Sequence, residues 1–107
     1  MTFEQLLGAL KQIKCKEVRS LERNYFEAVS SSADIGSFAA ILEPYFGSPF
    51  KPEKQKPTPE AIRHSEPYGG IRANQTMYLR KGDSGHEIAF FWPWEDGSSI
   101  TVKVAKV

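Results

Sequence analysis

The chain has 107 residues, 40% of them hydrophobic and 25% charged, and a formal net charge of +1. These values are typical of one globular domain, and the small net charge gives no overall field to attract nucleic acid or a membrane. The single cysteine, Cys15, cannot form an internal disulfide, which favours a reducing compartment. The longest apolar run near the start, residues 6–10, is too short for a signal-peptide core or a membrane span. We therefore expect one cytoplasmic domain over residues 1–107, with no membrane segment, cofactor or metal.

Two amphipathic helices are predicted in the N-terminal half. Thr2 and Gln5 have the spacing of a capping box, and apolar residues recur behind them at helical intervals. A second helix is expected after Asp34, a good N-cap residue. That helix should end or kink near Glu43, because Pro44 lacks an amide hydrogen and clashes one turn back. The apolar positions are Phe3, Leu6, Leu7, Leu10 and Ile13 in the first helix, and Ile35, Phe38, Ile41, Leu42 and Tyr45 in the second.

Residues 14–32 fit two interpretations. Their apolar positions recur near a 3.6-residue period, which favours a helix over 18–29, either continuous with the first or broken near Cys15. A strand over about residues 20–29 is the alternative, because Tyr, Phe and Val cluster there. Such a strand would pair with the C-terminal sheet and cover one of its faces. The apolar positions are Val18, Leu21, Tyr25, Phe26 and Val29.

Residues 47–59 form a connection rich in proline and lysine. Gly47 suits the left-handed end of the preceding helix. Four prolines are interleaved with three lysines, a density that prevents regular pairing and favours an extended path over the surface. A proline-rich ligand for another domain is the alternative. Thr58 and Pro59 then suit the N-cap and first position of a short helix over residues 59–65, which Pro67 ends.

The last third of the chain is predicted to form the sheet on which the rest of the domain packs. Three strand-like runs, 75–80, 88–94 and 100–107, are separated by two glycine-containing turns, the pattern of an antiparallel meander. The predicted fold class is therefore α+β. The N-terminal amphipathic helices should pack on one face of a C-terminal antiparallel sheet of three or four strands.

The turn at Glu95-Asp96-Gly97 sets the predicted register. A three-residue loop with glycine in the left-handed region pairs Trp92 with Ile100 and places apolar residues opposite one another throughout. A two-residue turn would instead set Trp92 against Thr101, so the first register is favoured. Across the other turn, Leu79 should face Ile88 and Met77 should face Phe90. The predicted core face carries Met77, Leu79, Ile88, Phe90, Trp92, Ile100, Val102 and Val104.

The opposite face would combine two aromatic residues, Tyr78 and Phe91, with two cations, Arg80 and Lys103. Together with Trp94, a candidate interface anchor next to Pro93, these residues predict a non-catalytic binding or protein-assembly module. Its partner would be another protein or a second copy of the chain. Single-stranded nucleic acid, stacked on the aromatic rings and held by the cations, is the alternative. In a third interpretation, another element covers this face and leaves the two cations at its rim.

Candidates for chemistry are few. Cys15 lies among basic residues that would lower the pKa of its thiol, and His86 is expected in a glycine-rich loop together with residues 82–85. A small enzyme would need one of these as its nucleophile or acid–base group, but no motif joins them. Two histidines and one cysteine at wide spacing do not make a zinc pattern. The sequence therefore predicts no catalytic or metal-binding residue.

Overall fold

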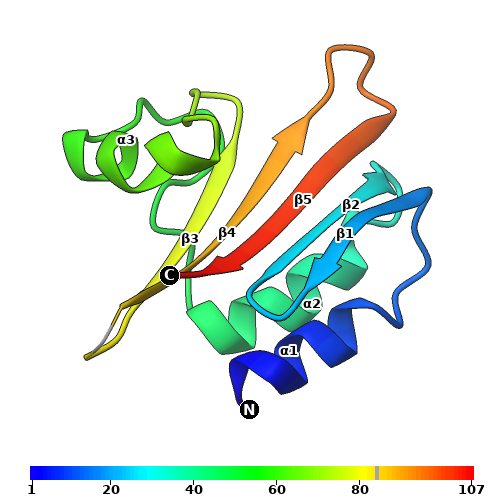
Figure 1. Cartoon of the computed structure of the whole chain (residues 1–107). Coiled ribbons are helices and arrows are strands. Elements are labelled where there is room, and N and C mark those ends of the chain that lie inside the picture. The colour runs from blue at the N-terminus through cyan, green and yellow to red at the C-terminus, as the bar shows by residue number, and fades with distance from the viewer. Residues whose placement is uncertain (84) are drawn as a thin grey trace.

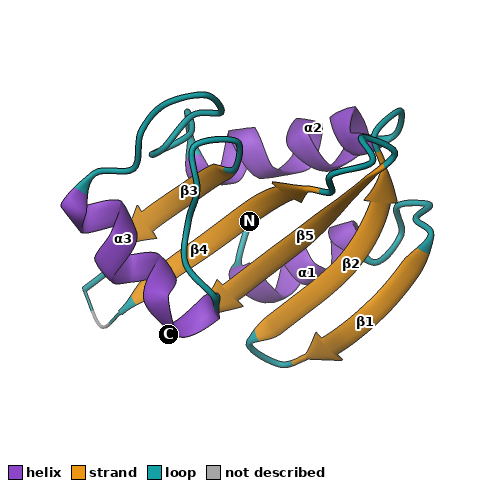
Figure 2. Ribbon diagram, turned by 90° about the horizontal axis from the view of Figure 1, so that it is seen from above, coloured by secondary structure: helices purple, strands orange, loops and turns teal. Residues whose placement is uncertain are grey.

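The computed structural model describes residues 1–83 and 85–107, so residue 84 of the predicted glycine-rich loop lies outside the described part. It contains a five-stranded antiparallel sheet in the order β1-β2-β5-β4-β3, with α1 and α2 on one face and α3 on the other (Figures 1 and 2). The predicted α+β class is confirmed, but the sheet has five strands instead of three or four. The elements are α1 (Phe3–Leu10), β1 (Glu17–Glu22), β2 (Tyr25–Ser31), α2 (Ile35–Phe46), α3 (Pro59–Ser65), the 3-10 helix η1 (Glu66–Tyr68), β3 (Thr76–Lys81), β4 (His86–Pro93) and β5 (Ser99–Lys106).

The segment for which a helix was favoured forms β1 and β2. β2 lies between β1 and β5, so it widens the sheet and does not cover one of its faces. Phe26 and Ala28 point to the α1 side, while Val29 is buried on the other side. Burial on both sides of a central strand removes strict alternation, and the remaining apolar positions matched a helical period by coincidence. β1 carries a bulge between Val18 and Ser20.

Both predicted amphipathic helices are present and pack against the same face of the sheet. The capping box forms: the Thr2 amide donates to Gln5 Oε1 (2.8 Å), and the Gln5 amide donates to Thr2 Oγ1 (3.1 Å). α2 continues beyond Pro44 to Phe46, and it ends at Gly47. Gly47 has a positive φ of 84°, which favours glycine, but its ψ of −164° differs from the left-handed helical stop that was expected. Pro44 falls in the last turn, and the burial of Phe46 in the core stabilises the helix beyond it.

The register between β4 and β5 differs from the one predicted. Trp92 pairs with Thr101 and Phe90 with Lys103, because the loop spans four residues, 95–98, and the Trp94 amide donates to the Ser99 carbonyl (2.9 Å). Inside this loop, Asp96 Oδ1 accepts from the Ser98 amide (2.9 Å), a contact that favours the wider turn. The predicted three-residue loop is therefore wrong. The predicted β3–β4 pairs, Leu79 with Ile88 and Met77 with Phe90, are confirmed.

The corrected register divides the predicted core face between two cores. α1 and α2 cover the side that includes Ile100, Val102 and Val104. α3 and η1 lie against the opposite side, where the predicted core residues Met77, Leu79, Ile88, Phe90 and Trp92 pack. Either set of alternate residues on β4 can be buried, which is why apolar pairing alone selected the wrong register.

The proline-rich connection is anchored to the sheet by one residue. Lys51 is buried, and it exchanges backbone hydrogen bonds with Met77 across an isolated bridge at the β3 edge (3.1 and 3.0 Å). Its ammonium group donates to the carbonyls of Ala73 (2.6 Å) and Gln75 (2.5 Å), and burial lowers the pKa of this group. The connection therefore covers part of the β3 edge and fixes the approach to β3.

Lys51→Ala should lower the free energy of unfolding by about 1–3 kcal/mol, because the carbonyls of Ala73 and Gln75 lose a charged donor. Urea denaturation followed by fluorescence measures the change. Lys56→Ala, at an exposed lysine of the same connection, is the matched control and should alter stability by less than about 0.5 kcal/mol. Equal effects of the two substitutions would show that the buried ammonium group does not anchor the connection.

Candidate functional site

The five residues predicted to form a binding surface do not meet. Tyr78 and Phe91 are buried in the core beneath α1 and α2, where their rings are in edge contact at 5.7 Å. Lys103 lies on the other face, with its Nζ 3.7 Å from the Trp92 ring centroid and donating to the Tyr68 carbonyl (3.0 Å). In the observed β4–β5 register Lys103 pairs with Phe90, whose side chain is on the opposite face from Phe91. A shift of one residue relative to the predicted register therefore separates Lys103 from Tyr78 and Phe91.

The other two predicted residues lie at opposite ends of the sheet. The Arg80 guanidinium stacks on the Tyr45 ring at 4.5 Å, and the Tyr45 hydroxyl donates to the Glu87 carboxylate. Burial and this carboxylate raise the pKa of Tyr45 to about 12. Trp94 is 40% exposed near the β4–β5 turn, and its Nε1 donates to Thr101 Oγ1 (2.8 Å). No single surface therefore unites the aromatic and basic residues that the sequence suggested.

The most open apolar part of the core side of the sheet lies on β1. Val18 and Leu21 pair with the buried residues Ala28 and Phe26, so they share the face on which α1 and α2 pack. They nevertheless remain 48% and 49% exposed. β1 is the edge strand of the sheet and lies beside β2. Neither α1 nor α2 extends over it (Figure 2). An apolar strip of β1 is consequently left without a covering element among the described residues.

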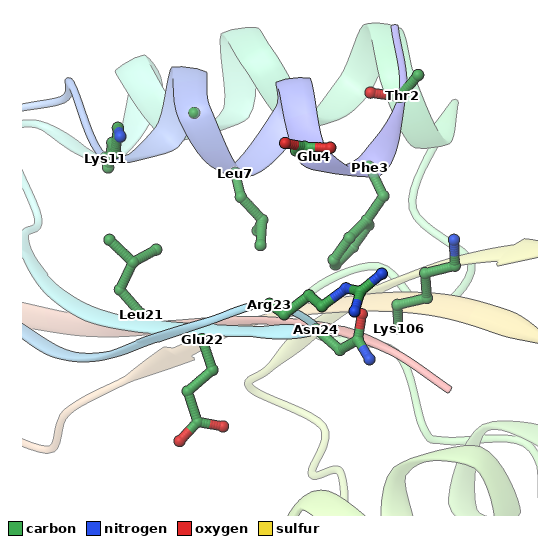
Figure 3. Close-up of a pocket in the computed structure, with 11 residues that line it drawn as sticks. Thr2, Phe3, Glu4, Leu7, Lys11, Leu21, Glu22, Arg23, Asn24 and Lys106 are labelled. Carbon is green, nitrogen blue, oxygen red and sulfur yellow. The ribbon is translucent and has the colours of Figure 1, made fainter.

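This strip borders a groove between α1 and the β1–β2 hairpin (Figure 3). The groove has a volume of about 920 Å³. In Figure 3, Phe3 and Leu7 point from α1 toward the hairpin, Leu21 points back toward the helix, and Glu22 points away. Apolar side chains therefore face each other across the groove. The remaining lining residues are Thr2, Glu4, Gly8, Lys11, Arg23, Asn24 and Lys106.

The charges at the groove are mostly positive and unpaired. Lys11, Arg23 and Lys106 form no ion pair with any residue in the described part of the chain. Arg23 and Lys106 lie at one end of the groove, and Lys11 lies at the other (Figure 3). Glu4 is the carboxylate on the α1 wall, whereas Glu22 is turned to the opposite face. The groove thus combines an apolar centre with a surplus of cations at its ends.

Gly8 lines the groove from the middle of α1. A Cβ atom at this position would have no atom of the described residues within 4 Å. Glycine in a helix interior costs about 1 kcal/mol relative to alanine. Internal packing therefore does not account for glycine at this position.

The sequence predicts the apolar stripe of α1 but not the groove beside it. The second wall of the groove is the hairpin that residues 17–31 form, whereas the period of the apolar residues favours a helix there. The available signal was the clustering of β-branched and aromatic residues in that segment. The glycine within the apolar run of α1 was a second, local signal.

Gly8→Ala should raise the free energy of unfolding by about 1 kcal/mol, because the added methyl group fits and the helix propensity improves. The same substitution at Gly69 should lower it by more than about 1 kcal/mol. Gly69 has a φ of 112°, and its Cβ would lie 2.8 Å from Trp92 Cη2. Chemical denaturation of both variants measures the contrast. A loss of stability in Gly8→Ala would show that internal packing requires the glycine.

The candidate catalytic residues do not form a pair. Cys15 Sγ donates weakly to the Glu17 carbonyl (3.6 Å), near the end of the sheet where Trp92 lies. His86 begins β4 and is therefore not a loop residue, and it lies six residues from Trp92, about 20 Å along the strand. Within residues 1–83 and 85–107, no group of three or more His, Cys, Asp and Glu residues could hold a metal ion.

His86 instead contacts the second histidine. The rings of His64 and His86 meet edge to face at 4.7 Å, where α3 packs on the start of β4. His64 Nε2 and His86 Nδ1 are buried without a hydrogen-bond partner in the described structure. Burial, followed by His86 and Arg63, lowers the pKa of His64, and these effects outweigh the attraction of Glu60 at 3.7 Å. The surroundings of His64 therefore favour its neutral form.

This contact predicts a loss of stability in mild acid. The native pKa of His64 lies below its ordinary value of 6.5, so the unfolded chain binds a proton more readily than the native protein. The free energy of unfolding should therefore fall as the pH drops through about 6.5 toward the lowered pKa. Urea denaturation at about pH 7.5 and about pH 5.5 should show a smaller decline for His64→Gln than for the parent protein. An identical decline in both proteins would contradict the assignment.

Comparison with protein-family models, curated proteins and solved structures finds no match for the chain. Among the described residues, no helix is both long and apolar enough to cross a membrane.

Proposed function

We propose that the protein is a non-catalytic binding module that holds a partner protein in the groove between α1 and the β1–β2 hairpin. The observation that carries this proposal is the half-exposure of Val18 and Leu21 on the core side of the sheet. Single apolar residues on a surface are ordinary, but an uncovered apolar strip beside a groove is typical of an interaction site. A partner would complete the cover that α1 and α2 leave unfinished.

Two competing functions have less support. Stacking of single-stranded nucleic acid depended on Tyr78 and Phe91, and both are buried beneath the helices. Thiol or acid–base chemistry depended on Cys15 or His86, which lie near opposite ends of the sheet. Binding through apolar contact needs neither arrangement.

The partner is expected to engage the side-chain face of β1 and not its free backbone edge. The bulge between Val18 and Ser20 interrupts the regular spacing of edge hydrogen-bonding groups. Glu17, Arg19 and Glu22 also place charges along this strand. Bulges and charges are features that protect edge strands from pairing with another strand. Assembly of two copies through a continuous sheet is therefore disfavoured.

Selection from a displayed random peptide library tests the proposal. Enriched peptides should bind the parent protein and lose at least tenfold in affinity, about 1.4 kcal/mol, against Leu21→Glu. Ile62→Glu is the matched control, because Ile62 is equally exposed but lies on α3, across the sheet from the groove. Circular dichroism checks that both variants fold. Failure to enrich any peptide, or binding that is insensitive to Leu21→Glu, would reject the groove as the binding site.

A further inference from the structure

We infer that the occupant of the groove is an amphipathic α-helix of a partner protein, with acidic residues beside its apolar stripe. This inference rests on the proposed function and specifies the partner of the same site. Three independent features point to it: the uncovered width of the sheet, the glycine in the α1 wall and the charges at the ends of the groove.

The incomplete helix layer on the core side of the sheet favours a helix. α1 and α2 lie side by side there and leave the edge strand β1 outside them (Figure 2). One more helix, packed beside α1 and over Leu21, would complete the layer and bury the apolar strip.

Gly8 provides the site of close approach. On α1, the residues that line the groove recur at helical spacing as Glu4, Leu7, Gly8 and Lys11. Glycine in this wall leaves the backbone of α1 uncovered by a side chain, and small residues allow two helix backbones to approach closely. The position is empty in the free protein, since no atom of the described residues would meet an added Cβ within 4 Å. A helix that crosses α1 at Gly8 would use this space.

The charges select an acidic helix. Lys11 at one end, and Arg23 and Lys106 at the other, have no ion-pair partner among the described residues. Carboxylates on an incoming helix could pair with all three, and the guanidinium of Arg23 can hold a carboxylate through two hydrogen bonds. A basic helix would meet three cations against the single carboxylate of Glu4. Charge complementarity therefore favours a helix with acidic residues near both ends of its apolar stripe.

Two synthetic peptides test the inference. Both have about 18 residues, an identical leucine stripe at helical spacing and alanine elsewhere, and differ only in flanking positions that carry Glu or Lys. Fluorescence anisotropy measures their affinity for the intact protein. The Glu peptide should bind at least tenfold more tightly than the Lys peptide, and added salt should narrow the difference. Amide chemical-shift changes should centre on α1 and the β1–β2 hairpin.

Two variants test the space at Gly8 and the charge of Arg23 separately, and a third serves as a control. Gly8→Gln places a long side chain in the groove without disturbing α1, and it should weaken the Glu peptide at least tenfold. Arg23→Glu should weaken the Glu peptide and strengthen the Lys peptide. Lys56→Glu, a charge reversal at an exposed site outside the groove, should leave both affinities unchanged.

The outcomes distinguish failure of this inference from failure of the proposed function. Equal binding of both peptides, lost together in Leu21→Glu, would retain the groove and overturn the acidic partner. Peptides from the display selection that bind the groove in extended form would overturn the helix. Concentration-dependent dimerisation abolished by Leu21→Glu would identify a second copy as the occupant. Absence of binding by both designed peptides and by every displayed peptide would overturn the proposed function as well.

Discussion

The antiparallel pairing of β2 with β5 joins the two halves of the chain, and the rest of the structure depends on it. It runs from Tyr25 opposite Ala105 to Ser31 opposite Ser99, without a bulge. This pairing turns β5 from the edge of a three-stranded meander into the centre of a five-stranded sheet. It also carries β1 to the new edge, beyond the reach of the two helices. The uncovered groove is a direct consequence.

Helices pack on both faces of the sheet, and this explains which parts of the structure could be predicted from the sequence. Helix positions, the capping box at Thr2 and the glycine that ends α2 depend on local interactions, which short segments of sequence encode. The β4–β5 register depends on which alternate set of residues is buried. Phe90 and Phe91 are both buried, on opposite sides, so hydrophobicity does not separate the alternatives. The position of α3, whose Ala61 packs in the same buried cluster as Phe90, completes the explanation.

Internal partners explain why the predicted binding residues do not form an exposed cluster. Arg80 stacks on Tyr45, and Lys103 stacks on Trp92 and donates to the Tyr68 carbonyl. Burial lowers the pKa of Lys103, but the aromatic face and the carbonyl offset part of the cost of desolvating the charge. A cation near aromatic residues in sequence can therefore be a structural contact as readily as a ligand contact. The register decides between them.

The groove differs from these internally satisfied sites in a physically specific way. Lys11 and Arg23 have neither an ion-pair nor a cation–π partner in the described structure, and Lys106 has only the Phe3 ring, 5.9 Å from its Nζ. The apolar residues on β1 stay half exposed, and Gly8 lowers helix stability without relieving any internal contact. Each feature is unfavourable or neutral in the isolated chain. Natural proteins commonly carry single destabilising features, because selection removes only those that bring stability below the threshold needed for function. Three such features on the walls of one groove are difficult to attribute to folding alone, and a partner that buries Leu21, crosses α1 at Gly8 and pairs with Arg23 would give all three a common physical cause.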